Sequence, residues 1–96
     1  MAKIVVSDTD FLSSFLKIRR LDLILNAFHT KSLLIPQAVA YELRRSTLRD
    51  FLDVALTAER IIIQEIKVHP IKGFGLGEIE SIALAEKTKG ILLMDD

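Results

Sequence analysis

Short runs of consecutive apolar residues alternate along this chain with longer stretches in which apolar residues recur every three or four positions. A short run rich in valine, isoleucine and leucine is typical of a strand buried on both faces, and the longer periodic stretches are typical of amphipathic helices. The runs predict strands at residues 4–6, 33–35, 61–63 and 91–94. The periodic stretches predict helices whose apolar residues lie within 11–18, 21–28, 39–43, 48–56 and 79–84.

Residues that favour turns and helix ends lie between these segments. Ser7 to Asp10 follow the first strand and are all residues that favour helix N-termini. Pro36 closes the second strand and suits the first turn of a helix, where its missing N–H costs nothing. Residues 67–77 contain one proline and three glycines and are expected to form a loop, and Gly90 is expected to end the last helix. The predicted strands are therefore all separated by helical segments.

Strands separated by helices favour a parallel sheet with helices on both faces. The chain has 96 residues, which is the length of one domain, and it shows no repeat or low-complexity tract. We therefore expect an α/β fold, a three-layer αβα sandwich with a parallel sheet of about four strands, in a single domain over residues 1–96.

Composition narrows the chemistry that this fold can support. The chain has no cysteine, and its two histidines, His29 and His69, lie far apart in the sequence. A bound metal would therefore have oxygen ligands, which favours Mg²⁺ or Mn²⁺. No apolar run approaches the ~18–20 residues of a membrane span, so a cytoplasmic location without membrane contact is expected.

Thirteen basic and thirteen acidic residues give a formal net charge of zero. This balance argues mildly against tight nucleic-acid binding, which usually needs a basic excess, but an enzyme can hold RNA briefly through a local patch. The chain has two basic clusters: Lys17, Arg19 and Arg20, and Arg44, Arg45 and Arg49. We expect the second cluster, which follows Glu42, to border the candidate site described below, with a solvated helix face as the alternative.

Carboxylates lie where the strands and helices of such a fold meet one edge of the sheet. Asp8 follows the first strand directly, and Asp95 and Asp96 follow the last. Functional sites of parallel α/β sheets gather at the carboxyl ends of the strands. Glu78 is expected in the first turn of the last helix, and Glu42 one or two turns into the helix after the second strand. The sequence thus predicts that these acids share one rim.

Acids that share a rim repel one another. Two unit charges ~4 Å apart interact by about 4 kcal/mol at an effective dielectric near 20. Such a cluster persists only if protons or a cation neutralise it. Oxygen ligands point to Mg²⁺ or Mn²⁺, and two such ions could bind the attacking and leaving oxygens in phosphodiester cleavage.

Each of these acids also has an alternative, purely structural interpretation. Asp8 and Asp10 could simply cap a helix, and Ser7 with Asp10 resembles a capping pair. Glu42 could be a solvated residue that pairs with Arg45 on the same helix face. Glu78 could be a surface charge favoured by the helix dipole, Glu80 is expected at the surface, and Asp95 with Asp96 could be a polar tail.

The order of these segments resembles that of the PIN-domain family. The opening strand with Ser7-Asp8-Thr9-Asp10 resembles the strand and Asp-Thr motif of PIN domains, and Leu33 to Pro36 with Glu42 resembles their segment of strand, proline and helix with glutamate. Residues 75–85 and 92–96 are similar to the closing motifs of a prokaryotic PIN subgroup. The similarity covers essentially the whole chain, and the last two motifs together are moderately specific.

The resemblance implies a Mg²⁺- or Mn²⁺-dependent ribonuclease, such as the VapC toxins of VapBC toxin–antitoxin pairs. By position, Asp8, Glu42 and Glu78 match the acidic ligands, Asp96 is the choice for the fourth, and Asp95 is close behind. These acids would hold the metal that activates water against an RNA phosphodiester. Thr9 would assist at the site, and Asp10 stands where a small polar residue is more usual. Arg44 and Arg45 are candidates for RNA binding, and an antitoxin protein is an expected partner.

PIN domains normally continue past the final Asp motif with a helix and a strand, whereas this chain stops at Asp96. An uncovered sheet edge and apolar helix surface would favour pairing with another copy, so a homodimer or higher oligomer is expected. The alternative function is an inactive PIN-like binding or dimerisation module.

A second alternative is a phosphatase similar to the haloacid dehalogenases. Asp8-Thr9-Asp10 after a strand mimics the nucleophile and acid of that class, and Met94-Asp95-Asp96 mimics its closing metal motif. No small residue or glycine follows Asp10, where that loop usually turns. This alternative is therefore weaker than the nuclease.

Overall fold

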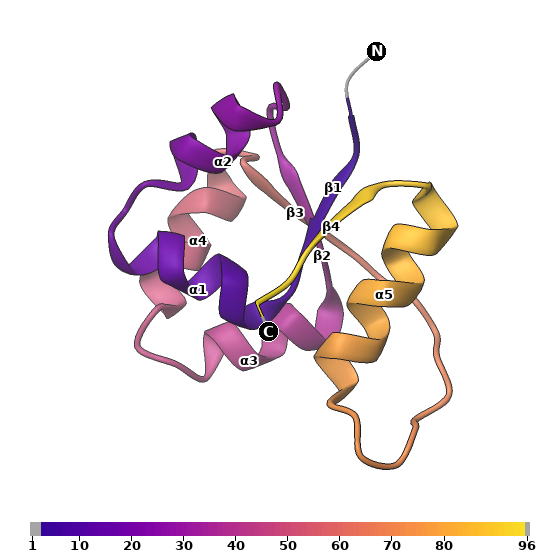
Figure 1. Ribbon diagram of the computed structural model, residues 1–96. Helices are drawn as coiled ribbons and strands as arrows, with labels where there is room; N and C mark the ends of the chain where they lie inside the picture. The colour runs from indigo at the N-terminus through magenta and orange to yellow at the C-terminus, as the bar shows by residue number, and fades with distance from the viewer. Residues whose placement is uncertain (1–2, 96) are drawn as a thin grey trace.

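The computed structural model describes residues 3–95 (Figure 1). Strands and helices follow one another in the predicted order, so the periodicity of the sequence is confirmed as its main structural signal. The elements are β1 (Val5–Ser7), α1 (Thr9–Lys17), α2 (Leu21–Ala27), β2 (Leu33–Pro36), α3 (Gln37–Arg44), α4 (Arg49–Thr57), β3 (Ile61–Gln64), α5 (Leu76–Thr88) and β4 (Ile91–Leu93).

The strands form one parallel sheet in the order β3-β2-β1-β4. In the register of the sheet, Val6 of β1 lies opposite Leu34 of β2 and Leu92 of β4. Helices α1, α2 and α4 lie on one face of the sheet and α5 lies on the other, with α3 below the carboxyl ends of the strands (Figure 1). The expected three-layer α/β fold with a parallel sheet is confirmed.

Alternate residues of the strands enter two different cores, because successive side chains of a strand point to opposite faces. Val5 of β1 and Leu33 of β2 belong to the larger core, which packs against α1, α2, α3 and α4. Val6 belongs to a smaller core with Leu84 and Ala85 of α5. This two-sided burial fixes the register of β1, and with it the direction in which the chain leaves the sheet at Asp8.

Helices α1, α2 and α4 end without glycine. Each is followed by a residue with positive φ, namely Arg19, His29 and Glu59 at 56°, 52° and 59°. After α1, the Arg20 N–H donates to the Phe15 carbonyl at 3.0 Å, which is the long hydrogen bond of a Schellman ending. The local hydrogen bonds therefore hold these residues in a conformation that usually favours glycine.

Two boundaries of α5 differ from the sequence prediction. The helix begins at Leu76, so Gly77 lies in its first turn and not in the preceding loop. At the other end Lys89, with φ of 56°, caps the helix, and Gly90 follows it. Gly90 has a different role, because a Cβ there would lie 2.8 Å from the carbonyl oxygen of Ile4. Glycine thus permits the close approach of β4 to β1.

Within residues 3–95, none of the helices combines the length and the apolar character that crossing a membrane requires.

Candidate active site

The carboxyl ends of β1 and β4 meet at one edge of the sheet, as the sequence predicts. Ser7 lies opposite Leu93 in the parallel register, and the Asp8 N–H donates to the Leu93 carbonyl at 3.1 Å. Asp95, two residues beyond Leu93, is exposed at the same edge. The predicted ligand Asp96 lies outside the described residues.

Asp8 has a structural role in addition to its place at the rim. It is the N-cap of α1, where its Oδ1 accepts the Phe11 N–H at 2.9 Å. The predicted capping pair of Ser7 and Asp10 is wrong: the Ser7 hydroxyl donates to the Asp8 carbonyl oxygen, and Asp10 is exposed in the first turn. A cap made by Asp8 itself orients this carboxylate without a partner at Asp10.

The Asp8 carboxylate lies in an unfavourable electrostatic environment. Only 7% of the residue is exposed, and this burial is the main cause that raises the pKa of Asp8 above its ordinary value. The Phe11 N–H opposes the rise, whereas the charges of Asp10, Asp95 and Glu78 add to it. Ionised Asp8 is therefore a group that a nearby cation would stabilise.

Helices α3 and α5 bring two further acids to this edge. Glu42 of α3 and Glu78 of α5 are both exposed, and both line a small hollow of about 150 Å³ in which Asp8 lies. Residues that the sequence separates by most of the chain therefore share one cavity. The lining of this acidic hollow is Asp8, Thr9, Asp10, Glu42, Gly75 and Glu78.

Gly77 is a residue whose importance the sequence interpretation missed. A Cβ at this position would lie 2.9 Å from Oε1 of Glu42, 3.5 Å from Val39 Cγ2 and 3.6 Å from Oγ1 of Thr9. The first turn of α5 thus approaches α3 closely because residue 77 has no side chain. This approach lets Glu42 of α3 line the same hollow as Thr9 and Glu78.

The prediction that Glu80 lies at the surface is wrong. Glu80 is 4% exposed, and its Oε1 accepts the Ala38 N–H at 3.0 Å. Pro36, the N-cap of α3, makes no side-chain cap, so a free N–H in the first turn of α3 is available to a carboxylate from another helix. Glu80 supplies this carboxylate and thereby ties α5 to the start of α3. No spacing in the sequence marks such a cap between helices.

Gln37 fixes the long segment that precedes α5. Its side-chain nitrogen donates to the Ile66 carbonyl at 2.6 Å, and its Oε1 accepts the Ile66 N–H at 2.9 Å. The side-chain amide therefore pairs with a backbone amide as a neighbouring strand would. This pair holds the loop that leads to Gly75 and Glu78.

The family of this chain follows from its match to known sequences. A family model described as PIN domain matches residues 4–96. The chain belongs to the PIN-domain family. It matches no curated protein and no solved structure. Membership of this family points to nuclease-type chemistry, and it removes the support for the phosphatase alternative.

The acids of this PIN domain fit a divalent cation by their chemistry. The groups that line the hollow are carboxylates and a hydroxyl, and hard cations such as Mg²⁺ and Mn²⁺ prefer oxygen ligands. The pKa of Asp8 is raised mainly by burial and further by the charges of nearby acids, and a cation would relieve the repulsion from those acids. Within residues 3–95, however, no group of three acidic or histidine side chains is arranged so that it could hold a metal ion. The hollow is thus an open acidic site with a fixed Asp8 and exposed glutamates.

The basic clusters of the PIN domain lie in different places. Arg44 lines a groove that also contains Glu42, as expected for the second cluster. Arg45 donates to the Tyr41 hydroxyl at 2.7 Å and does not make the alternative pairing with Glu42. In the first cluster, Arg20 pairs with Asp22 at 3.1 Å. Arg44 is therefore the basic residue that shares a groove with one of these acids.

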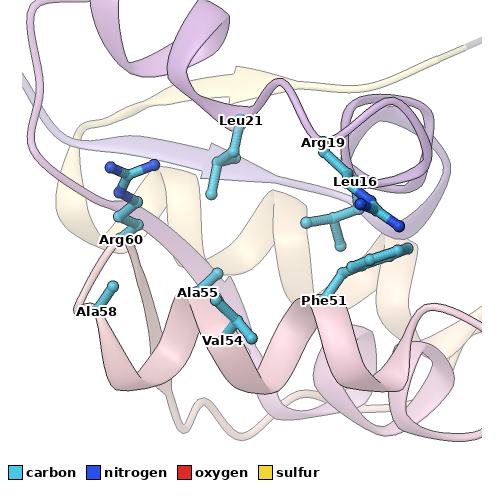
Figure 2. A pocket seen from close by; sticks show the side chains of 8 residues that line it. All are labelled: Leu16, Arg19, Leu21, Phe51, Val54, Ala55, Ala58 and Arg60. Carbon is cyan, nitrogen blue, oxygen red and sulfur yellow. The ribbon is translucent and has the colours of Figure 1, made fainter.

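A larger, mostly apolar hollow of about 330 Å³ lies away from the acids, between the α1–α2 connection and α4 (Figure 2). Leu16 and Leu21 form one side and Ala55 lies across from them on α4. The Arg19 guanidinium lies 4.8 Å from the centroid of the Phe51 ring. Among the described residues 3–95, no carboxylate lines this hollow, so it is not our candidate for the nuclease chemistry.

Proposed function

We propose that this PIN domain is a metal-dependent endoribonuclease that cleaves RNA phosphodiesters. The observation that carries the proposal is that Asp8, Glu42 and Glu78 all line one small hollow at the carboxyl edge of the sheet. These acids come from three separate segments of the chain. The pKa of Asp8 is raised mainly by burial and further by neighbouring acidic charges, that of Glu78 among them, so a bound cation would stabilise its ionised form.

Asp8 would anchor the site, because its cap on α1 fixes the orientation of its carboxylate. Glu42 and Glu78 are exposed, so their carboxylates have the freedom to turn toward a common Mg²⁺ or Mn²⁺. Asp96, or Asp95 beside it, is the further ligand proposed from the family motif. When bound, the cation supplies the positive charge that lowers the pKa of a water and polarises a phosphoryl oxygen. Thr9 lines the hollow and is proposed to orient a water or a phosphate oxygen by hydrogen bonding.

Arg44 and Arg45 are proposed to contact the RNA backbone next to the acids. Arg44 lines the groove that shares Glu42 with the acidic hollow. Guanidinium groups suit this role because they bind phosphate with two parallel hydrogen bonds. A VapC-type toxin role, with an antitoxin as partner and a homodimer or higher oligomer as the assembly, belongs to the same proposal.

The test is cleavage of a single-stranded RNA by the purified chain, in Mn²⁺, in Mg²⁺ and in a chelator. We expect cleavage with either metal, none in the chelator, and a loss of at least about 100-fold in Asp8→Asn, since even residues that only support metal ligands cost 10–100-fold when changed. The matched control is Asp53→Asn, an exposed acid of α4 outside the acidic hollow.

Thermal unfolding separates a working site from an inactive one. A cation that binds the folded chain raises its melting temperature by mass action. We expect this rise in the parent and in Asp53→Asn, but not in Asp8→Asn. Absence of both cleavage and the metal-dependent rise would favour the inactive binding module, and cleavage that survives Asp8→Asn would overturn the assigned site.

A further inference from the structure

A groove of about 600 Å³ between α3 and the start of α5 adjoins the acidic hollow. Its apolar lining comes from Ala38 and Tyr41 of α3 and from Leu76 of α5. Glu42 lines both the groove and the hollow. A polymer that lies in the groove therefore reaches the acids without leaving the surface of α3.

Tyr41 is unusual among the apolar side chains of α3. Val39 and Leu43 of the same helix are fully buried, with 0% and 1% exposed, whereas 60% of Tyr41 is exposed. An aromatic ring in this position contributes little to the core. It is instead a flat apolar surface on the wall of a groove.

Arginines lie beside this ring on the same side of the helix. Arg44 and Arg45 follow Tyr41 by three and four residues, the spacing that places side chains next to each other on a helix. The Arg45 guanidinium donates to the Tyr41 hydroxyl at 2.7 Å, and its central carbon lies 5.3 Å from the ring centroid. The guanidinium therefore lies over part of one face of the ring and is held there by its bond to the hydroxyl. It thereby restrains the ring while much of its surface stays open.

We propose that Tyr41 is a stacking platform for one nucleobase of a single-stranded RNA substrate, next to the phosphodiester held at the acidic hollow. The proposal rests on the proposed nuclease function and names the form of RNA that this site accepts. Bases in single strands stack on aromatic side chains and on arginine planes, and each such stack contributes to affinity without requiring a particular sequence.

The charges of the groove favour a base over a phosphate at this position. Glu42 and Glu80 both line the groove, and their carboxylates repel an anionic group but not the neutral face of a base. Arg44 also lines it, and with Arg45 it offers cations to the phosphates on either side. A base held inside a duplex has both faces covered by its neighbours, so the platform selects against double-stranded RNA.

The chain itself contains the probe for this proposal, because it has one tyrosine and no tryptophan. Its tyrosine fluorescence therefore comes from Tyr41 alone, and a base stacked on the ring quenches it. The experiment titrates the Asp8→Asn chain, which is expected to leave RNA intact, with a short single-stranded RNA and with the same RNA annealed to its complement. Free tyrosine amide at the same RNA concentrations corrects for absorption by the bases.

We expect the single strand to quench the emission to saturation and the duplex to leave it nearly unchanged. Tyr41→Ala in the same background should weaken single-strand binding, measured by fluorescence anisotropy of labelled RNA, by roughly 5- to 150-fold, the range for one base–aromatic stack. Tyr41→Phe keeps the ring and should bind within about threefold of the parent, since it loses only a hydrogen bond to Arg45 on an exposed face. Equal quenching by duplex, or Tyr41→Ala binding as tightly as the parent, would overturn the platform.

Salt separates stacking from simple charge attraction. The loss caused by Arg45→Ala should shrink as salt rises, because phosphate contacts weaken with counterion concentration. The loss caused by Tyr41→Ala should persist across the same range. A Tyr41→Ala effect that disappears with salt would show that the ring only positions Arg45, which contradicts the proposal.

Failure of the platform and failure of the nuclease function give different results. Metal-dependent cleavage by the otherwise unchanged chain, together with binding that ignores Tyr41, would refute the platform alone. Binding that depends on Tyr41 without any cleavage by that chain would refute the nuclease function and leave a single-stranded RNA-binding surface.

Discussion

The apolar hollow and the acidic hollow of this PIN domain differ in both size and lining. The apolar hollow between the α1–α2 connection and α4 has a volume of about 330 Å³ and is lined mainly by leucine, alanine, valine and phenylalanine (Figure 2). The acidic hollow at the carboxyl edge of the sheet has about 150 Å³ and is lined by carboxylates, Thr9 and Gly75. The apolar hollow has the mostly apolar lining that is typical of ligand pockets, whereas the acidic hollow contains the carboxylates and the hydroxyl that could take part in a reaction.

If the acidic hollow is the active site, as we propose, volume and apolar lining are poor guides to it in this domain. Like charges held near one another cost stability, so a chain keeps them together only where other contacts enforce the arrangement. The enforcing contacts are visible here: the cap by Asp8, the close approach at Gly77 and the buried bond from Ala38 to Glu80.

Among the residues that support the acids without being candidate ligands, Gly77 gives the largest expected effect on cleavage when it is changed to alanine. The added methyl would lie 2.9 Å from Glu42 Oε1, so the flexible glutamate must turn away from Thr9. We expect cleavage to fall by roughly 10–100-fold, as for changes that displace a metal ligand. Stability should be unchanged or rise by up to about 1 kcal/mol, because alanine suits a helix better than glycine. Cleavage rates and urea unfolding of the same preparation measure the two effects.

Gly75→Ala is the matched control, since a Cβ at Gly75 would meet no atom of residues 3–95 within 4 Å apart from its chain neighbours. It should cleave nearly as well as the parent. If both variants lose activity equally, a general disturbance of the start of α5 is the cause and the role of Gly77 is wrong.

Glu80→Ala tests whether the contact between α5 and α3 supports the acidic hollow. The change leaves the buried Ala38 N–H without its partner, which costs about 1–3 kcal/mol. Glu80→Gln keeps an acceptor oxygen and should lose less than half of this amount. Denaturant unfolding gives the comparison, and identical losses in the two variants would contradict the cap.

Asp8→Asn should make the domain more stable at neutral pH, while the activity is lost. Burial raises the pKa of folded Asp8, so the folded chain binds its proton more tightly than the unfolded chain does. The stabilising effect of the proton is fully present below the ordinary value of 3.8 and is lost as pH rises through the folded pKa. Asparagine stays neutral and caps a helix as well as aspartate.

Melting temperatures of the parent and Asp8→Asn from acidic to neutral pH measure this difference, in the absence of divalent metal. The two curves should approach each other at low pH and separate as pH rises. A parent that is the more stable of the two at neutral pH would show that the cap and the helix dipole outweigh burial.

Arg19→Ala should have the smallest effect and should leave the acidic hollow untouched. It removes the contact of the Arg19 guanidinium with the Phe51 ring, which contributes about 0.5–1 kcal/mol at an exposed site. The residue also has a positive φ, which alanine would have to adopt in its place. Thermal unfolding should show a small loss, and RNA cleavage should stay within about twofold of the parent, as for a surface change far from a site. A large loss of cleavage would mean that the apolar hollow takes part in RNA binding, which would remove the distinction between the two regions.

The sequence by itself determined the layers of this protein. Apolar runs and helical periodicity are local signals, so the strands, the helices and the parallel sheet followed from them. The sequence also indicated which acids belong to one edge, because Asp8 and Asp95 directly follow strands that end at the same rim. Helix ends were harder to predict from the sequence, because Arg19, His29 and Glu59 adopt a positive-φ conformation that is typical of glycine.

Only the tertiary structure decided which groups support the acids. Glu80 and Glu78 are two residues apart, yet one is buried as a cap for another helix and the other is exposed at the hollow. The groove beside Tyr41 and the close approach at Gly77 likewise exist only where α3 and α5 meet. Periodicity reports which side of a helix is buried, but the partner of a polar side chain depends on the distance between helices, and no local pattern carries that distance.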